Sequence, residues 1–507
     1  MKHFKSPVLY FLLVATFFFL ACNKEKKATP SETEEEANLY TETYRPQFHF
    51  SPPANWMNDP NGMVYFEGEY HLFYQHYPDG NVWGPMHWGH AVSEDLVHWE
   101  NLPIALYPDK LGYIFSGSAV VDHKNTSGLG KDGQIPMIAI YTYHLEEGEQ
   151  EDQNYNQTQG IAYSLDKGRT WEKYEANPVL SNPGIKDFRD PKVMWHDESD
   201  SWIMSLAVKD KISFYTSENL IDWEYSSDFN PDWAAYGGVW ECPDLFPLIT
   251  KDGEEKWILL VSINPGGPNG GSATQYFIGD FDGKTFSTSD EEVKWLDYGA
   301  DNYAGVTWAN VPKDDGRTLF IGWMSNWLYG QEVPTEAFRS AMTLPRQLSL
   351  FKAEEGFYIA STPVEELKKL RTESKVLNTS EIKLENELAE IELTPNQEDF
   401  KIVFSNELGD EVVFEKSGQE IIFDRSQSGL TGFSESFPEI HHIPDLGISI
   451  EKLRIFIDQS SIEFFINDGE LAITELIFPN APLNLIETSG IANEVKIHNL
   501  KSIWNLD

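Results

Sequence analysis

Residues 56–74 read WMNDPNGMVYFEGEYHLFY and combine an acidic motif with a β-hairpin. The hairpin follows Gly62, because two runs of aromatic and β-branched residues flank a Glu-Gly turn. The motif before it places a carboxylate, Asp59, directly before a proline. A proline lacks an N–H and restricts the residue before it, so this carboxylate is expected at a loop or strand edge.

The same combination recurs along the chain. Two more motifs open with an aromatic residue and join a carboxylate to a proline: Phe188-Arg189-Asp190-Pro191 and Trp240-Glu241-Cys242-Pro243-Asp244. Each precedes an expected hairpin, and weaker hairpin patterns start near Phe115 and Gly305. Five units therefore begin near residues 59, 116, 190, 241 and 307. Repeated small antiparallel sheets of this kind are typical of a β-propeller, which exposes few strand edges.

A propeller would bring the three acidic motifs together. Equivalent positions on successive blades converge on the central channel. Asp59, Asp190 and Glu241 are therefore expected to meet, although 182 residues separate the first from the last. The alternative is an array of β-sandwiches in which the motifs are only turns.

The second half of the chain has a different pattern. From about residue 376, apolar and polar residues alternate with period two, which indicates an antiparallel β-sandwich. Residues 363–371 predict one short helix. The expected fold is all-β: a five-bladed β-propeller at residues 44–355, a linker with a short helix at 356–375, and a C-terminal antiparallel β-sandwich at 376–507.

The N-terminus has the pattern of a targeting segment. Lys2 and Lys5 precede an uncharged apolar stretch, residues 7–21, that is short for a membrane span and typical of a signal peptide. Residues 19–22 (FLAC) resemble a bacterial lipoprotein cleavage box, although Phe stands where Leu is more usual. The resemblance implies that residues 1–22 form a lipoprotein signal segment and that Cys22 becomes lipidated. An ordinary secretory signal or an uncleaved anchor is the alternative.

The residues after Cys22 predict how the folded part is attached. Residues 23–43 are almost without apolar side chains and predict a disordered, solvated tether. We therefore expect a membrane-anchored lipoprotein of the cell envelope, periplasmic or surface-exposed, which touches the membrane only through its lipid.

Charge narrows the possible partners. The formal net charge is −43, which repels phosphate backbones and disfavours nucleic acid as a partner. The two cysteines are Cys22 and Cys242, so lipidation of the first leaves no internal disulfide. Oligomeric state is left open.

Three convergent carboxylates indicate carbohydrate hydrolysis. One carboxylate can attack an anomeric carbon while a second protonates the leaving oxygen. A third can hold sugar hydroxyls and stabilise the positive charge of the transition state. The 16 Trp and 22 Tyr include enough aromatic faces for sugar stacking. A calcium site and a non-catalytic sugar-binding propeller are the competing hypotheses.

The motifs themselves resemble those of family 32 glycoside hydrolases, the fructan hydrolases and invertases. The residues that carry the resemblance are Trp56–Gly62, Phe73–Gln75, Trp83-Gly84, Met86–Ala91, Phe115–Gly117, Phe188–Pro191, Trp240–Asp244, Gly322–Trp327, Thr343–Arg346 and Asp458–Glu463. They occur in order and cover nearly everything from Tyr44 onward.

The resemblance implies a retaining β-fructosidase that removes terminal fructose from levan, inulin or sucrose through a covalent fructosyl–enzyme intermediate. Asp59 matches the nucleophile, Glu241 the general acid/base and Asp190 the transition-state stabiliser, with the first two carboxyls about 5–5.5 Å apart. The positions that match the lining of the fructose pocket are Trp56, Asn58, Gln75, Trp83, Phe115, Ser116, Arg189 and Trp327. No cofactor and no metal are expected.

Several alternatives remain open at this point. Phe338 stands where Trp is common in exo-acting members, so an endo-levanase or a plain invertase is possible. Outside the enzymes, the alternative is a fructan-binding surface lipoprotein without activity. Arg189 could instead be a structural ion-pair partner, and Trp327 a core residue.

Overall fold

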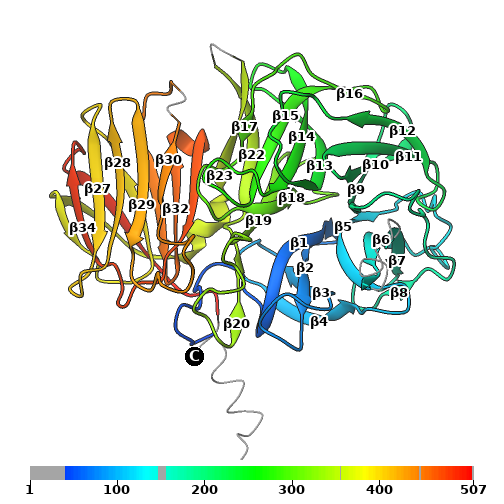
Figure 1. The fold of residues 1–507 in the computed structure, drawn as a ribbon, viewed down its shortest axis with the longest axis horizontal. Helices are drawn as coiled ribbons and strands as arrows, with labels where there is room; N and C mark the ends of the chain where they lie inside the picture. Colours follow the sequence, from blue (N-terminus) through cyan, green and yellow to red (C-terminus); the bar gives the residue numbers. More distant parts are fainter. Residues whose placement is uncertain (1–39, 147–155, 354–355, 445–446, 505–507) are drawn as a thin grey trace, which may run out of the picture. The chain divides into compact units, whose positions relative to one another are not determined.

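The structure, a computed structural model, describes residues 40–146, 156–353, 356–444 and 447–504. Cys22, the signal segment and most of the expected tether lie outside these residues. Among the residues that are described, no helix is long and apolar enough to cross a membrane. Figure 1 shows strands almost throughout.

Five antiparallel sheets follow one another between residues 55 and 363. The first contains β1 (Asn55–Phe66), β2 (Glu69–Tyr77), β3 (His87–Ser93), β4 (Glu100–Leu106) and a short parallel addition, β20 (Phe338–Arg339). The second contains β5 (Tyr113–Val121), β6 (Met137–His144), β7 (Gln157–Ser164) and β8 (Glu172–Lys173). The third contains β9 (Phe188–His196), β10 (Ser201–Val208), β11 (Lys211–Ser217) and β12 (Glu224–Phe229).

The last two sheets complete this half of the fold. The fourth contains β13 (Val239–Ile249), β14 (Glu255–Asn264), β15 (Ala273–Phe281), β16 (Phe286–Ser287) and β17 (Lys294–Trp295). The fifth contains β18 (Tyr303–Thr307), β19 (Thr318–Met324), β21 (Ala341–Met342), β22 (Arg346–Lys352) and β23 (Phe357–Pro363).

The first strands of the five sheets form the centre of a β-propeller. β1, β5, β9, β13 and β18 each contact the next in this order, and β18 contacts β1 (Figure 1). Each predicted unit coincides with one of these strands. Side chains on both faces of the sheets are buried, as in β6, where all eight residues are buried.

The C-terminal part is a β-sandwich of two six-stranded sheets. One contains β24 (Arg371–Asn378), β35 (Glu494–Leu500), β26 (Ala389–Leu393), β31 (Leu453–Asp458), β32 (Ser461–Ile466) and β33 (Leu471–Leu476). The other contains β25 (Glu381–Lys383), β34 (Leu485–Ser489), β27 (Phe400–Ser405), β28 (Glu411–Ser417), β29 (Glu420–Gln427) and β30 (Ile440–Ile443). Inward-facing residues such as Ile402, Phe414 and Phe464 form its core, so the predicted alternation is confirmed.

The predicted linker at residues 356–375 is wrong at both ends. β23 pairs with β22 and belongs to the fifth sheet, and β24 already belongs to the sandwich. Between them lies only a 3₁₀ helix, η1 (Glu365–Leu370), where the short helix was predicted. The reason is local, because the aromatic and apolar residues from Phe357 to Ala360 complete a hairpin and Leu367 and Leu370 are buried. A second one-turn 3₁₀ helix, η2 (Asn467–Gly469), joins β32 to β33.

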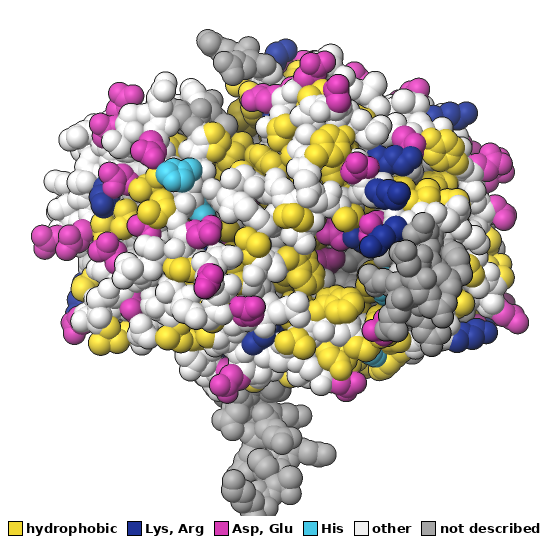
Figure 2. All heavy atoms as spheres, in the orientation of Figure 1, with side chains coloured by type: hydrophobic (Ala, Val, Ile, Leu, Met, Phe, Trp, Pro, Cys, Tyr) yellow, Lys and Arg dark blue, Asp and Glu magenta, His cyan; other side chains and the backbone are white. Residues whose placement is uncertain are grey.

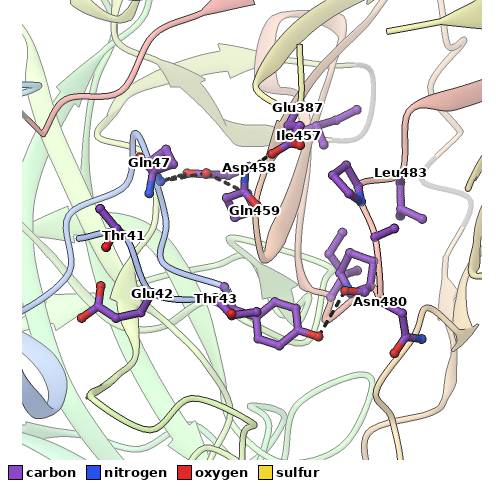
Figure 3. Close-up of a pocket in the computed structure, with 15 residues that line it drawn as sticks. Thr41, Glu42, Thr43, Gln47, Glu387, Ile457, Asp458, Gln459, Asn480 and Leu483 are labelled. Carbon is purple, nitrogen blue, oxygen red and sulfur yellow. Dashed lines mark hydrogen bonds between the residues drawn. The ribbon is translucent and has the colours of Figure 1, made fainter. Parts of the chain in front are cut away.

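The end of the predicted tether is also corrected. Residues 40–43 pack against the folded part, because the ring of Tyr40 stacks on Trp504 with centroids 3.8 Å apart. Asn101 Nδ2 donates to the Tyr40 hydroxyl at 2.7 Å, and burial raises the pKa of Tyr40 to about 12. Figure 3 shows this segment beside the sandwich, where the Gln47 N–H donates to Asp458 and residues of both parts line a hollow of about 370 Å³. The stacking of Tyr40 and the hydrogen bonds of Tyr40 and Glu42 thus hold residues 40–43 against the folded part.

Buried charges join the propeller to the sandwich. We call five of them the interdomain cluster: His49, Asp297, Arg346, Asp458 and Glu463. Arg346 donates to Glu463 Oε2 at 2.6 Å and to Asp297 Oδ2 at 2.8 Å. His49 bonds Asp458 Oδ2 at 2.7 Å and Glu463 Oε1 at 2.8 Å. Every member of the cluster thus has an oppositely charged partner.

Candidate active site

Each of the five first strands carries a β-bulge near its start. In β1, Met57 pairs with His76 and Pro60 with Tyr74, so Asn58 and Asp59 lie opposite Gln75 alone. The equivalent bulged pairs are Phe115-Ser116 in β5, Asp190-Pro191 in β9, Cys242-Pro243 in β13 and Ala304-Gly305 in β18. A bulge releases residues from the ladder and re-aims their side chains. The fold therefore presents five redirected positions around one centre.

The bulges explain the carboxylate–proline motifs. Pro191 and Pro243 lie within a bulge and Pro60 directly follows one, at points where a missing N–H interrupts no regular pairing. The carboxylates therefore lie inside long strands and not at loops. Asp190 and Cys242 adopt left-handed φ angles of 62° and 45°. Such strained backbone persists where the surrounding structure enforces it, as at functional sites.

The expected meeting of carboxylates is confirmed. The sulfur of Cys242 is 3.7 Å from Asp59 Oδ2 and 3.7 Å from Asp190 Oδ2. The backbone N–H of Cys242 donates to Asp190 Oδ2 at 3.1 Å, and Glu241 is the preceding residue. Burial and the neighbouring aspartates raise the pKa of the Cys242 thiol well above its usual value. Cys242 is therefore a protonated donor between two carboxylates and not a nucleophile.

Hydrogen bonds fix the orientation of Asp59. Ser116 Oγ donates to Oδ2 at 2.6 Å, and Asn58 Nδ2 donates to Oδ1 at 3.0 Å. Trp56 is fully buried and reaches the site through its Nε1, which donates to Asn58 Oδ1 at 2.7 Å. Gln75 is buried too, and donates to Asn61, which in turn donates to the carbonyl of Asp59. Four residues predicted to line the pocket thus hold Asp59 in place: Trp56, Asn58, Gln75 and Ser116.

The pKa values reflect crowding of negative charge. Burial raises the pKa of Asp59, with a further contribution from the charge of Glu241, although Ser116 and Asn58 oppose the shift. Burial also raises the pKa of Asp190 to about 7, where the charge of Arg189 opposes and those of Glu241 and Asp59 add. Like charges held together disfavour ionisation, here that of Asp59 and of Asp190. One guanidinium does not compensate three carboxylates.

Glu241 is held by two residues from the neighbouring strands. Arg189 Nη2 and Nε donate to Glu241 Oε1 at 2.8 and 3.2 Å, and the Tyr303 hydroxyl donates to Oε2. Arg189, Glu241 and Tyr303 each directly precede the bulge of their own strand, so register alone brings them together. Arg189 Nη1 also donates to Asp187 at 2.7 Å. Arg189 is therefore an ion-pair partner of Glu241 and hydrogen-bonds it directly.

Two residues that contact the site, Tyr303 and Asp187, were not predicted. Aligning the unit that contains Gly305 with the unit that contains Pro243 would have revealed Tyr303, because Tyr303 stands two residues before Gly305 as Glu241 stands two before Pro243. Asp187 has no comparable signal, since it lies just outside the aromatic-led motif.

Aromatic side chains border the carboxylates. Trp327 is partly exposed and packs against the buried rings of Trp56 and Trp323, with centroids 5.8 and 4.9 Å away. Phe115 stacks on His144, and Trp83, 38% exposed, meets Phe115 edge to face at 6.1 Å. Figure 2 shows a recess near the middle of the face in view, with acidic side chains in it and both apolar and basic side chains at its edges. An acidic centre with an aromatic border suits a neutral, hydroxyl-rich ligand.

Comparison with known proteins identifies relatives along almost the whole chain. Residues 49–363 match the N-terminal domain of glycosyl hydrolases family 32, and residues 360–504 match the C-terminal domain of the same family. A levanase of Bacillus subtilis (strain 168) is 46% identical over 92% of this chain and 72% of its own length. The extracellular exo-inulinase inuE of Aspergillus niger is 40% identical over 92% of this chain and 96% of its own length.

Solved structures agree with these relatives. The exo-inulinase of Aspergillus awamori superposes with a TM-score of 0.83 at 38% identity, covering 92% of this chain and 100% of that chain. The β-fructofuranosidase of Schwanniomyces occidentalis, complexed with fructosyl-erythritol, superposes with a TM-score of 0.80 at 31% identity, covering 91% of this chain and 99% of that one. The junction of the two matched domains, at residues 360–363, coincides with the end of β23.

Proposed function

The chain belongs to glycosyl hydrolases family 32, and from this we propose that it is a retaining β-fructosidase acting on fructans such as levan and inulin and on sucrose. The observation that carries the proposal is the gathering of Asp59, Asp190 and Glu241 around Cys242 by bulges on three first strands. The three carboxylates take separate roles in a double displacement.

In the first step, an oxygen of ionised Asp59 attacks the anomeric carbon of the terminal fructosyl residue. The bond from that carbon to the glycosidic oxygen breaks, and Glu241 gives its proton to the departing oxygen. The product is a fructosyl ester of Asp59. Ser116 and Asn58 donate to Asp59 and so favour its ionised form against the opposing effect of burial.

In the second step, Glu241 takes a proton from water, and the water oxygen attacks the same carbon. The ester bond to Asp59 breaks, and fructose leaves with its β configuration retained. Asp190 lies beside Asp59 across the Cys242 sulfur, where it can hold ring hydroxyls and stabilise positive charge at the anomeric carbon. Arg189 and Tyr303 keep Glu241 in place through both proton transfers.

Exo action on polymers is the mode of attack we propose. It is supported by relatives described as exo-inulinases, which this chain covers almost end to end. Product analysis separates the possibilities: only fructose from levan and inulin means exo action, released oligosaccharides mean an endo enzyme, and turnover of sucrose alone means an invertase.

We also propose that the five sheets are the five blades of the propeller. The supporting observation is the closed order of contacts from β1 through β5, β9, β13 and β18 back to β1. The bulge at one level of all five first strands is what a fivefold repeat predicts.

The expected lipid anchor stays a proposal for the segment before the fold. Cys22 follows an apolar stretch and precedes a polar one, which supports attachment to a membrane of the cell envelope. Labelled palmitate should enter the full-length protein in a bacterial host and should not enter the Cys22→Ala variant. Equal labelling of both proteins would refute lipidation at Cys22.

The acid/base assignment is tested with Glu241→Ala. This variant should lose about 10²–10⁴-fold in kcat on sucrose, because its leaving group needs a proton. It should keep far more of its rate on a fructoside whose leaving group departs as a stable anion. Glu241→Ala with wild-type activity on both substrates would show that Glu241 is not the proton donor.

A further inference from the structure

A loop from the fifth sheet reaches the first sheet beside the site. Residues 325–337, which we call the rim loop, connect β19 to β20. β20 then pairs in parallel with the start of β1, with Phe338 opposite Asn55 and Arg339 opposite Trp56. The rim loop therefore ends next to the strand that carries Asp59.

Arg339 holds the rim loop in one conformation. Its guanidinium donates to three main-chain carbonyls of the loop, those of Gln331, Val333 (3.0 Å) and Thr335 (2.8 Å). The planar guanidinium can bond several acceptors at fixed angles, so it fixes these three carbonyls relative to one another. Burial lowers the pKa of Arg339, and its Nε lacks an acceptor among the described residues. This arrangement costs stability and so suggests that the loop's position matters for function.

The rim loop in turn holds the turn that carries Trp83. The side chain of Gln331 accepts from the Trp83 N–H at 3.3 Å. The carbonyls of Thr335 and Glu336 accept from Asn81 Nδ2 at 3.0 and 2.8 Å.

From the other side, β1 holds the same turn. The Trp56 N–H donates to the Gly80 carbonyl at 3.0 Å, and Asn55 Nδ2 donates to the Pro78 carbonyl at 2.6 Å. The turn that carries Trp83 is thus held by hydrogen bonds from β1 on one side and from the rim loop on the other. The hydrogen bonds from the rim loop depend on Arg339, because Arg339 holds that loop in place.

Trp83 is well placed to touch a sugar. Its ring is 38% exposed and leans edge to face on Phe115, whose neighbour Ser116 donates to Asp59. An exposed indole that packs on Phe115, the residue before Ser116, offers an apolar face to a sugar ring.

We propose that Arg339 is a positioning residue that sets the place of Trp83 through the rim loop and thereby determines how tightly the enzyme binds its substrate. The proposal rests on the proposed function. Arg339 touches none of the three carboxylates in the contacts described, so its loss should weaken binding without slowing the chemical steps. Such a change raises KM and leaves kcat nearly unchanged.

The test is a double-mutant cycle of Arg339→Gln and Trp83→Ala, measured on sucrose and on inulin. Each single variant should raise KM roughly five- to tenfold with kcat within about twofold of wild type. In the Trp83→Ala background, Arg339→Gln should raise KM almost no further, because both substitutions remove the same contact between Trp83 and the substrate. If the rise in KM of the double variant equals the product of the two single rises, the proposal is wrong. A fall in kcat with KM unchanged would also overturn it.

Two controls keep the test decisive. Arg317→Gln removes another partly buried arginine, paired with Asp315 and Glu366, and should leave KM unchanged. If Arg339→Gln does not fold, Asn81→Ala cuts the same connection without touching Arg339 and should give the same rise in KM in the wild-type background only. An unchanged KM for Asn81→Ala would overturn the proposal.

Failure of the proposed function is a separate outcome. If the wild type hydrolyses neither inulin nor sucrose, the proposed activity is wrong. The affinity of each variant for inulin oligosaccharides, measured by calorimetry, then replaces KM in the same cycle. Non-additive losses of affinity support the role of Arg339, and additive losses refute it.

Discussion

The active-site carboxylates and the interdomain cluster both contain buried carboxyl groups, but the pKa values of these groups shift in opposite directions. In the interdomain cluster, burial would raise the pKa of Glu463, but Arg346 and His49 lower it to about 2. In the site, burial raises the pKa of Asp59, and the pKa of Asp190 rises to about 7 with Arg189 as the nearby cation. The first arrangement favours ionised groups, and the second disfavours them.

The difference shows where the fold gains stability and where it gives stability up. Buried opposite charges with good geometry compensate the cost of leaving water. Carboxylates gathered on strained bulges do not, and they persist because the rigid propeller holds them together. The raised pKa of Asp59 and of Asp190 shows that this part of the molecule is arranged for reactivity and not for stability.

The largest expected effect comes from neutralising the nucleophile. Asp59→Asn should lose at least about 10³-fold in kcat, since the amide cannot form the fructosyl ester. Its free energy of unfolding should stay equal or rise, because one carboxylate leaves a crowded cluster. Steady-state kinetics and urea unfolding of the same preparation check both halves. A large loss of stability would contradict the contrast drawn with the interdomain cluster.

The opposite pattern is expected in the interdomain cluster. Glu463→Gln removes one of the two buried carboxylate partners of Arg346 and of His49, which keep Asp297 and Asp458, and should cost about 3 kcal/mol of unfolding free energy. The kcat of the folded fraction should stay within about twofold of wild type, because no member of the cluster bonds the site carboxylates. Unfolding curves and active-site titration measure the two quantities. A stable variant with lost activity would reverse the assignment of roles.

The two regions should also differ in their dependence on pH. Burial would lower the pKa of His49, but Asp458 and Glu463 raise it to about 9, so its contribution is complete below about pH 6.5 and is lost as pH rises through 9. The raised pKa of Asp190 makes stability fall as pH rises from about 4 to 7. Each slope is at most about 1.4 kcal/mol per pH unit.

Variants separate these two slopes. Asp190→Asn should flatten the fall in unfolding free energy between about pH 4 and 7 and leave the higher range unchanged. His49→Gln should do the reverse, removing the fall between about pH 6.5 and 9. Urea unfolding across this range gives the slopes. If both variants flatten the same window, the two regions do not titrate independently.

The smallest effect is expected at an exposed pair. Lys124 and Asp200 form an ion pair at 2.8 Å, with side chains 59% and 80% exposed. Lys124→Met should change the unfolding free energy by less than about 1 kcal/mol and kcat not measurably. Thermal unfolding of Lys124→Met and of Glu463→Gln under the same conditions compares the loss at an exposed pair with the loss at a buried one. A loss comparable to that of Glu463→Gln would show that burial does not explain the contrast.

The sequence was informative where chemistry and turn signals coincide. The aromatic, acidic and proline residues around Asp59, Asp190 and Glu241 located three first strands and predicted their convergence. The bulges themselves were not predicted, because register depends on the partner strand. For the same reason Arg339 carries no local sign that it reaches the rim loop, and Tyr303 is recognised only when its unit is aligned with the unit that contains Glu241.

Boundaries were the weaker part of the sequence analysis. Composition predicted a solvated tether to residue 43, but Tyr40 packs against the distant residues Trp504 and Asn101, which no local pattern shows. Likewise, the interdomain cluster joins residues such as His49 and Glu463 that are 414 positions apart, and no pattern along the chain shows such a pairing.

The most direct test of the central claim is the identity of the residue that carries the sugar. Glu241→Ala should be mixed with an activated fructosyl donor, quenched with acid, digested and measured by mass spectrometry. We expect one added anhydrofructose unit on the peptide that contains Asp59, and none when Asp59→Asn is combined with Glu241→Ala. Turnover of the donor with the adduct on another peptide, or on none, would contradict the central claim.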